Sequence, residues 1–273
     1  MIPSSVRADF PILNRLENGR PLIYLDSAAT SQKPIQVIEA EARFYREKNA
    51  NIRRGVYLLA HEATELYEAA RRKIAAFIGA QAEEVVFTRG TTEGLNLAAW
   101  CLGETRVSFG DRILVTEMEH HANLLPWQVL ARRKNAELLA VPIDAKGHLD
   151  LGAFRRMLTR KTKVVAVAHV SNVLGTVNPV AGIAEEAHGV GAIVVVDAAQ
   201  SVPHMPVNVR ELGADVLVFS GHKMLGPTGI GILWAKSELL EEWPPFLTGG
   251  EMIREVWIDR ATWADPPAKF EAG

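Results

Sequence analysis

The sequence has little of what marks secreted, membrane-spanning or nucleic-acid-binding proteins. It contains one cysteine, Cys101, which excludes an internal disulfide framework and fits a reducing compartment. Its 30 Lys and Arg residues against 32 Asp and Glu residues leave a net charge of −2, so no basic footprint for nucleic acid is present. The longest apolar runs, such as 164–168, fall far short of the roughly 18 residues that a spanning helix needs, and the amino-terminal residues show no export pattern. We therefore expect a cytoplasmic protein that binds neither nucleic acid nor membrane.

What is present is the composition of an ordinary globular protein. The 273 residues are 48% hydrophobic and 23% charged, and no repeat or flexible linker divides them. Short apolar runs alternate with segments of helical spacing from about residue 62 onward. The strand candidates are residues 84–88, 112–116, 137–141, 163–170, 193–197, 215–219 and 229–234, and the helix candidates are 62–77, 91–102, 126–135, 151–158 and 183–188. This alternation predicts an α/β fold with a mostly parallel, doubly wound sheet; the last strand follows without a helix and is expected to run antiparallel.

Polar residues follow several of these strands, and the carboxyl ends of strands are where ligands gather in such sheets. Thr91 and Thr92 open a helix after the first strand, an arrangement that suits a phosphate but also suits a plain helix cap. Asp197 ends a fully apolar strand, where a charge needs a cationic or hydrogen-bonding partner. Lys223 lies between an apolar strand and a glycine-rich turn, a place that a solvated loop lysine can also occupy.

Taken together, these residues suit one phosphorylated, planar, nitrogen-containing ligand. Lys223 provides an amine for an aldehyde, and Asp197 provides a carboxylate for a protonated ring nitrogen. The remaining candidates are Thr91, Thr92, Ser220 and His222 for a phosphate, Asn172 and Gln200 for a ring oxygen, and His121 for a stacking surface. The ligand that needs this set is pyridoxal 5′-phosphate (PLP). No metal site is expected, because the adjacent histidines at 120 and 121 point about 100° apart on a helix.

Several segments of the chain resemble one family. They are Tyr24–Thr30 (YLDSAAT), Phe87–Glu93 (FTRGTTE), Met118–Asn123 (MEHHAN), His169–Gly175 (HVSNVLG), Asp197–Ser201 (DAAQS) and Ser220–Gly229 (SGHKMLGPTG). Together they resemble the class V aminotransferase superfamily, specifically the SufS-type cysteine desulfurases and selenocysteine lyases, from about residue 9 to the last residue. The resemblance implies the large domain of a PLP-dependent fold-type I enzyme with a seven-stranded sheet, and a homodimer.

The same resemblance implies roles and boundaries. Lys223 corresponds to the Schiff-base lysine, Asp197 to the pyridinium partner and His121 to the ring-stacking residue, while Gly250 lies in a loop that reaches the partner subunit's phosphate. Residues 1–20 would pack with a small domain, 21–263 would form the PLP-binding large domain, and 264–273 would begin the connection to a carboxyl-terminal small domain that this chain lacks. Two positions depart from the family pattern: Arg53 and Thr248.

The implied reaction converts L-cysteine into L-alanine and passes the sulfur through an enzyme persulfide to an acceptor protein, for iron–sulfur cluster assembly. Cys101 lies in an apolar helical run and is interpreted as a buried structural cysteine, so the chain alone is expected to be inactive. The alternatives are a selenocysteine lyase or another class V PLP enzyme, and a PLP-binding protein without catalytic activity.

Overall fold

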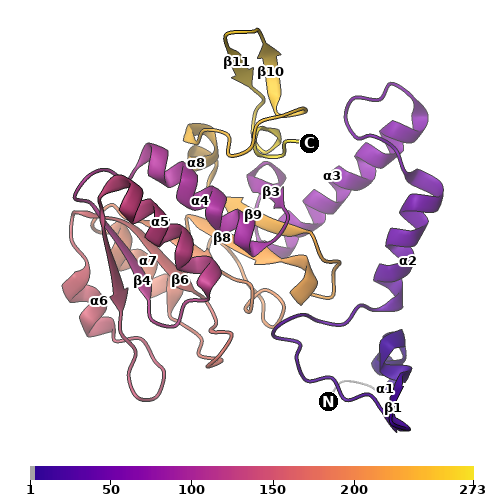
Figure 1. Ribbon diagram of the computed structural model, residues 1–273, viewed down its shortest axis with the longest axis horizontal. Helices are drawn as coiled ribbons and strands as arrows, with labels where there is room; N and C mark the ends of the chain where they lie inside the picture. The colour runs from indigo at the N-terminus through magenta and orange to yellow at the C-terminus, as the bar shows by residue number, and fades with distance from the viewer. Residues whose placement is uncertain (1–3) are drawn as a thin grey trace.

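A seven-stranded sheet forms the centre of the molecule in the computed structural model, which describes residues 4–273 (Figure 1). Its strands lie in the order β3-β9-β8-β7-β6-β4-β5. Their bounds are β3 (Val85–Thr88), β4 (Arg112–Thr116), β5 (Glu137–Val141), β6 (Thr162–Ala168), β7 (Ile193–Asp197), β8 (Val216–Ser220) and β9 (Gly231–Ala235). Neighbours from β5 to β8 pair in parallel, whereas β9 runs antiparallel to both β8 and β3. The predicted α/β class and the antiparallel last strand are confirmed.

Helices cover both faces of this sheet, because strands that are apolar on both sides need two covering layers. One buried cluster joins the sheet to residues of α3, α6 and α7, and a second joins it to α4, α5 and α8. The helices are α3 (Leu58–Ile78), α4 (Thr91–Thr105), α5 (Leu125–Lys134), α6 (Leu151–Met157), α7 (Val180–His188) and α8 (Ser237–Glu242). Figure 1 shows α4 and α5 side by side in front of the sheet.

Two glycines let α4 approach the sheet closely. A Cβ at Gly94, in the first turn of the helix, would lie 2.3 Å from Val218 Cγ1 on β8. A Cβ at Gly231, where β9 begins, would lie 2.4 Å from the Cα of Gly90, which precedes the helix. Larger side chains at either position would push the helix start away from the sheet, so these glycines place the amino terminus of α4 against the end of β8.

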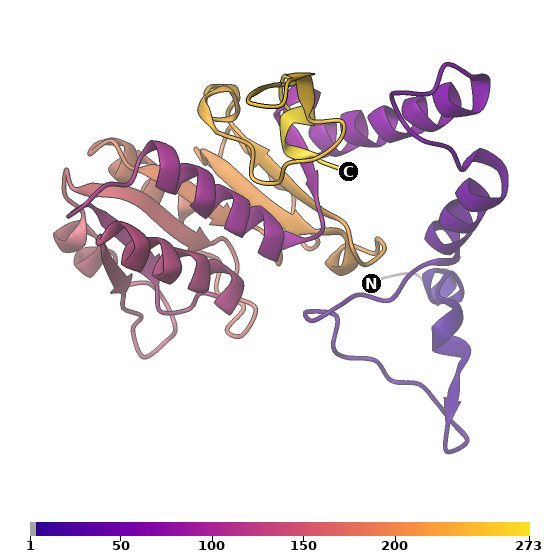
Figure 2. The same cartoon turned by 45° about the horizontal axis from the view of Figure 1, so that its top comes forward.

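The amino-terminal segment stands apart from the sheet (Figures 1 and 2). It consists of α1 (Ser4–Ala8), a short β1–β2 hairpin (Leu16–Glu17 and Arg20–Pro21), α2 (Ile35–Arg43) and one π-helical turn, Phe44–Lys48. Several of its apolar side chains are exposed, Leu25 at 91% among them. This arm has no counterpart in the predicted elements, although Ile35, Ile38 and Ala42 of α2 have helical spacing.

The carboxyl-terminal segment returns to the sheet after the β10–β11 hairpin (Ile253–Val256 and Ala261–Trp263). It is held there by Glu271, whose buried carboxylate accepts hydrogen bonds from Arg71 on α3 and from the backbone N–H of Phe87 on β3. Over the described range, no helix has the length and apolar character needed to cross a membrane.

Candidate active site

The carboxyl ends of the parallel strands enclose a polar cavity of about 440 Å³. Because β6, β7 and β8 point the same way, the side chains that follow them meet at this edge of the sheet. Its wall includes eight of the residues singled out from the sequence: Thr91, Thr92, Asn172, Asp197, Gln200, Ser220, His222 and Lys223. The structure therefore brings together residues that are up to 132 positions apart, from Thr91 to Lys223.

Asp197, the last residue of β7, is the buried carboxyl group of this cavity. It is 6% exposed, and burial raises its pKa above the ordinary value. The backbone N–H of Ala199 donates to its Oδ1 at 2.9 Å, and the charges of Lys223 and His120 oppose the effect of burial on its pKa. A carboxylate held in this way favours a cationic N–H as a partner.

Lys223 lies in a short 3₁₀ turn, Gly221–Lys223, directly after β8. Burial lowers the pKa of its amine, and the charge of Asp197 opposes that shift. A lysine with a lowered pKa has a larger fraction of the neutral, nucleophilic amine near neutral pH. The pKa of the neighbouring His222 is also lowered, first by burial and then by the charges of Lys223 and Lys33.

The backbone of this lysine turn is held by residues 30–33, the part of the amino-terminal arm between β2 and α2. The carbonyl oxygen of His222 accepts from Thr30 Oγ1 at 3.1 Å, from Ser31 N and Oγ at 3.0 Å each, and from Lys33 Nζ at 2.9 Å. Ser31 Oγ in turn accepts from the backbone N–H of Leu225 at 2.8 Å. Residues far apart in the sequence thus hold the lysine turn in a single geometry.

The amino terminus of α4 forms the part of the wall next to the end of β8. Thr91 is buried, and both its backbone N–H and its hydroxyl lie within hydrogen-bond distance of Ser220 Oγ, at 2.8 and 2.7 Å. Thr92 follows on the exposed side and also faces the cavity. Hydroxyl groups and free N–H groups at a helix start are the usual ligands of a phosphate.

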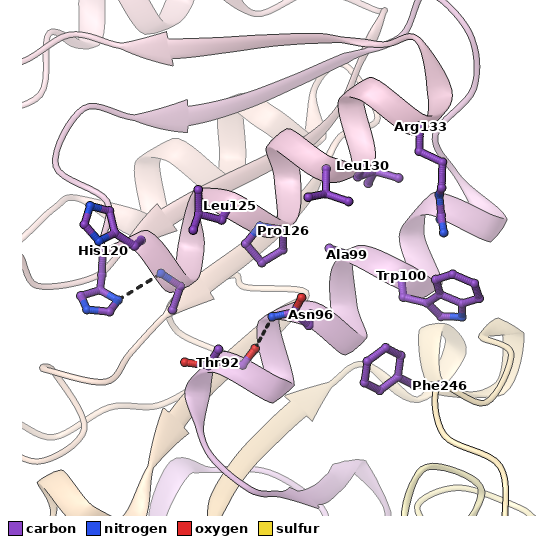
Figure 3. Close-up of a pocket in the computed structure, with 13 residues that line it drawn as sticks. Thr92, Asn96, Ala99, Trp100, His120, Leu125, Pro126, Leu130, Arg133 and Phe246 are labelled. Atoms are coloured by element: carbon purple, nitrogen blue, oxygen red, sulfur yellow. Dashed lines mark hydrogen bonds between the residues drawn. The ribbon is translucent and has the colours of Figure 1, made fainter.

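The two adjacent histidines are placed differently. His120 lines the cavity, and its Nδ1 accepts the backbone N–H of Ala122 at 3.1 Å, which turns the ring back over the start of the 3₁₀ turn (dashed line in Figure 3). His121 does not line this cavity; it lines the neighbouring groove and the outer surface. The structure therefore places His120, and not His121, beside Asp197 and Lys223. Adjacent residues differ in direction, and the sequence carries no signal that decides between them.

That neighbouring groove, of about 520 Å³, lies between α4 and α5 (Figure 3). Its floor and walls are mostly apolar and include Leu125, Pro126 and Leu130 of α5 and Phe246. The groove shares Thr92, His120 and Ala122 with the polar cavity, so the two hollows adjoin.

One further predicted site residue lies outside the cavity wall, and three wall residues of the amino-terminal segment were not predicted from the sequence. Gly250 lies near the guanidinium of Arg54, and is not part of the cavity wall. Asp26, Ala28 and Ala29 belong to the wall, and Gln200 Nε2 donates to the carbonyl oxygen of Ala28 at 2.7 Å. The segment containing these three residues resembles the family pattern in the sequence, and that resemblance was the signal that could have assigned them to the site.

Cys101 lies inside the helical layer. It is 0% exposed, its Sγ lies 3.3 Å from the carbonyl oxygen of Pro244, and burial raises the pKa of the thiol to about 12. It is therefore a structural thiol in this fold, as its apolar neighbours in the sequence predict.

Comparisons with known proteins match this architecture. The family model described as aminotransferase class-V matches residues 23–273. A probable cysteine desulfurase of Streptomyces coelicolor is 52% identical over 275 residues, which cover 98% of this chain and 66% of the relative. The apo structure of a cysteine desulfurase from Thermococcus onnurineus superposes with a TM-score of 0.94 at 45% identity over 100% of this chain and 66% of that one. The cysteine desulfurase CsdA of Escherichia coli superposes with a TM-score of 0.90 at 41% identity, over 100% and 67%.

This chain spans 66% of the length of the Streptomyces protein. The matched part contains the whole sheet and every residue of the cavity wall. Since the family model covers all but the first 22 residues, the chain belongs to the aminotransferase class-V family.

Proposed function

We propose that the cavity binds PLP and that the chain is the cofactor-binding part of a cysteine desulfurase. The observation that carries this proposal is the placement of a lysine amine of lowered pKa and a buried carboxyl group, Lys223 and Asp197, in the wall of one cavity. The amino terminus of α4 adds the hydroxyls of Thr91, Thr92 and the adjoining Ser220, the type of group that binds a phosphate; Thr91 and Ser220 are hydrogen-bonded to each other in this structure. This donor set fits the aldehyde, the pyridine nitrogen and the phosphate of PLP.

When bound, PLP supplies an aldehyde for an amine and a ring that accepts an electron pair as a proton leaves the substrate. Asp197 would hold a proton on the ring nitrogen through its buried carboxylate. Lys223 would hold the aldehyde, and its amine is the group that could move a proton of the substrate's α-carbon. His120 would provide the stacking surface, because it lines the cavity wall and His121 does not.

The other wall residues bind and orient. Thr91, Thr92, Ser220 and His222 would hold the phosphate, and Asn172 and Gln200 would bind the ring oxygen. The amide of Gln200 already donates to Ala28 O, so it also ties the amino-terminal segment to the site.

The substrate proposed is L-cysteine, converted into L-alanine, with the sulfur passing to an acceptor protein through an enzyme persulfide. The relatives named cysteine desulfurase support this choice. Cys101 is not the sulfur-carrying thiol, because its burial and raised pKa keep it protonated and inaccessible. We accordingly propose that these 273 residues do not by themselves turn over cysteine.

The domain organisation proposed is the one that the family resemblance implies. Residues 21–263 form the PLP-binding unit, residues 264–273 lead toward a small domain, and the amino-terminal segment to residue 20 packs with that domain; residues 1–3 lie outside the described part. We further propose a homodimer in which the loop of Gly250 reaches the partner's site, a cytoplasmic location consistent with the single cysteine, and a role in iron–sulfur cluster assembly.

The test is the binding of added PLP to the purified chain. The wild type should develop a visible absorption band, and borohydride reduction should fix the cofactor to the peptide that contains Lys223, as read by mass spectrometry. Lys223→Ala should lose both signals, whereas Lys161→Ala, an exposed lysine at the opposite end of the sheet, should keep them. A band of equal intensity in Lys223→Ala would exclude the proposed site.

A further inference from the structure

Glu119 is a carboxyl group directly beside the site that the proposed mechanism leaves without a role. Its Oε1 accepts the hydroxyl of Thr116 at 2.6 Å and the backbone N–H of Ala168 at 2.9 Å, and its Oε2 accepts Asn123 Nδ2 at 2.5 Å. Thr116 and Ala168 are the last residues of β4 and β6, which are neighbours in the sheet. The carboxyl group therefore joins two strand ends to the turn that begins at His121.

The contact with Asn123 extends this connection inward. Asn123 is 0% exposed, and its Oδ1 accepts the indole N–H of Trp127 at 3.1 Å. Because the amide of Asn123 donates on one side and accepts on the other, a flip of the amide would lose both bonds. Glu119 is thus the acceptor that this buried series of hydrogen bonds requires, and it positions His120, the next residue.

The sheet register brings Glu119 next to Asp197. Ala168, whose N–H Glu119 accepts, pairs with Asp197 across β6 and β7. Burial raises the pKa of Glu119 to about 7, its three donors oppose that effect, and the negative charge of Asp197 adds to it. The two carboxyl groups are therefore coupled, and such coupling acts in both directions.

We propose that Glu119 is a positioning residue of the cofactor site: it holds the His120 segment against the ends of β4 and β6 and places a second negative charge beside Asp197. This inference rests on the proposed function. The added charge stabilises protons on the groups that face Asp197. The strength of this stabilisation changes near neutral pH, because Glu119 itself takes up or releases a proton there.

The charged and titratable groups around this pair come from three elements. Asp197 on β7 faces Glu119, while Lys223 from the turn after β8 and His120 from the segment after β4 face Asp197. His169 follows Ala168 on the β6 side; it is 5% exposed, and burial lowers its pKa, so it is neutral at neutral pH. Within this set, the charge of Glu119 changes near pH 7.

The experiment compares Glu119→Gln with Glu117→Gln in the full chain loaded with PLP. Glu117 is the matched control, because it lies two residues away, is exposed, and also accepts a backbone N–H, that of Ile143 at 3.1 Å. The readout is the pH midpoint of the visible absorption band of bound PLP. The wild-type midpoint is expected above pH 7. Loss of the negative charge in Glu119→Gln should lower this midpoint by about 0.5 to 1 pH unit, and Glu117→Gln should match the wild type.

Two further variants separate charge from shape. Glu119→Asp keeps the charge but shortens the side chain, so its midpoint should stay near that of the wild type. Thr116→Val removes one donor and leaves Glu119 less ionised, so its midpoint should shift in the same direction as Glu119→Gln by a smaller amount; it decides the question if Glu119→Gln does not fold. A Lys223-dependent band whose midpoint is unchanged in Glu119→Gln, or in Thr116→Val if the former is unfolded, would overturn this inference alone. A wild-type chain without that band would overturn the proposed function, and this inference with it.

Discussion

Replacing Glu271 by Gln tests whether this residue holds the carboxyl-terminal segment against the sheet. The Glu271 carboxylate accepts from Arg53 Nη2 at 3.0 Å, Tyr67 Oη at 3.0 Å, Arg71 Nη1 and Nη2 at 2.7 and 2.8 Å, and the N–H of Phe87 at 2.8 Å. The side chains of Glu271 and Arg71 are 6% and 2% exposed. Burial lowers the pKa of Arg71, but the hydrogen bonds and charges of Glu271 and Glu68 outweigh it and raise the pKa overall.

The expected loss of stability follows from the buried Arg71 charge that Glu271→Gln leaves without its main partner. Removing one partner of a buried ion pair costs about 3–5 kcal/mol, because the other charge stays buried without compensation. Gln keeps a carbonyl acceptor for one or two of the five donors, and Glu68 still pairs with Arg71 Nε at 2.9 Å. We therefore expect Glu271→Gln to lower the free energy of unfolding by about 3 kcal/mol, and Glu271→Ala by more.

The assay is urea unfolding followed by tryptophan fluorescence, with Glu255→Gln as control because Glu255 is exposed. The control should stay within about 0.5 kcal/mol of the wild type. Arg71→Leu should be comparably destabilising, and the double variant should lose less than the sum of the two, since it leaves neither charge unpaired. A loss below about 1 kcal/mol in Glu271→Gln would refute the reasoning, because it would mean that the network is solvated or replaceable.

Three further outcomes are expected. Cys101 should resist alkylation at pH 8 in the native chain and react once the chain is unfolded in urea, because burial raises the pKa of its thiol to about 12; rapid native labelling would contradict its placement. Gly231→Ala should destabilise the chain by about 1–3 kcal/mol and weaken PLP binding, since its Cβ would lie 2.4 Å from Gly90 Cα, whereas Gly182→Ala, with open space around it, should do neither. The pKa of Glu119 is raised from an ordinary 4.5 to about 7, so the folded state holds a proton that the unfolded state has released, and this contribution to stability is lost as pH rises from 4.5 through 7. Glu119→Gln should remove up to about 3 kcal/mol of that decline in urea unfolding measured at pH 5 and pH 8, and an unchanged pH dependence would show that Glu119 is solvated.

Much of the fold was accessible from the sequence because the central strands are apolar on both faces. The predicted strands 112–116, 137–141 and 193–197 agree with β4, β5 and β7 at both ends. The amino-terminal arm was not predicted: its elements are short, and apolar side chains such as Ile38 and Leu25 remain exposed in the described chain.

The candidate site divides in the same way. Asp197 and Lys223 were identifiable because one ends an apolar strand and the other lies in the turn that follows one, and the structure brings both into one cavity wall. Two contributions could not be read from the sequence. The direction of His120 depends on a backbone turn in which its Nδ1 accepts the N–H of Ala122. The environment of Glu119 depends on a strand register that pairs Ala168 with Asp197.

The sequence by itself determined the fold class, the parallel sheet and the chemical types available at its carboxyl edge, since strand burial and residue type are local properties. Only the tertiary structure decided which of these side chains share a cavity, because that depends on the order of the strands in the sheet. In that order β6, β7 and β8 are neighbours, β4 lies on the other side of β6, and β5 lies at the edge. The clamp of Thr30, Ser31 and Lys33 on the carbonyl oxygen of His222 joins segments about 190 residues apart, and such a contact has no local signature.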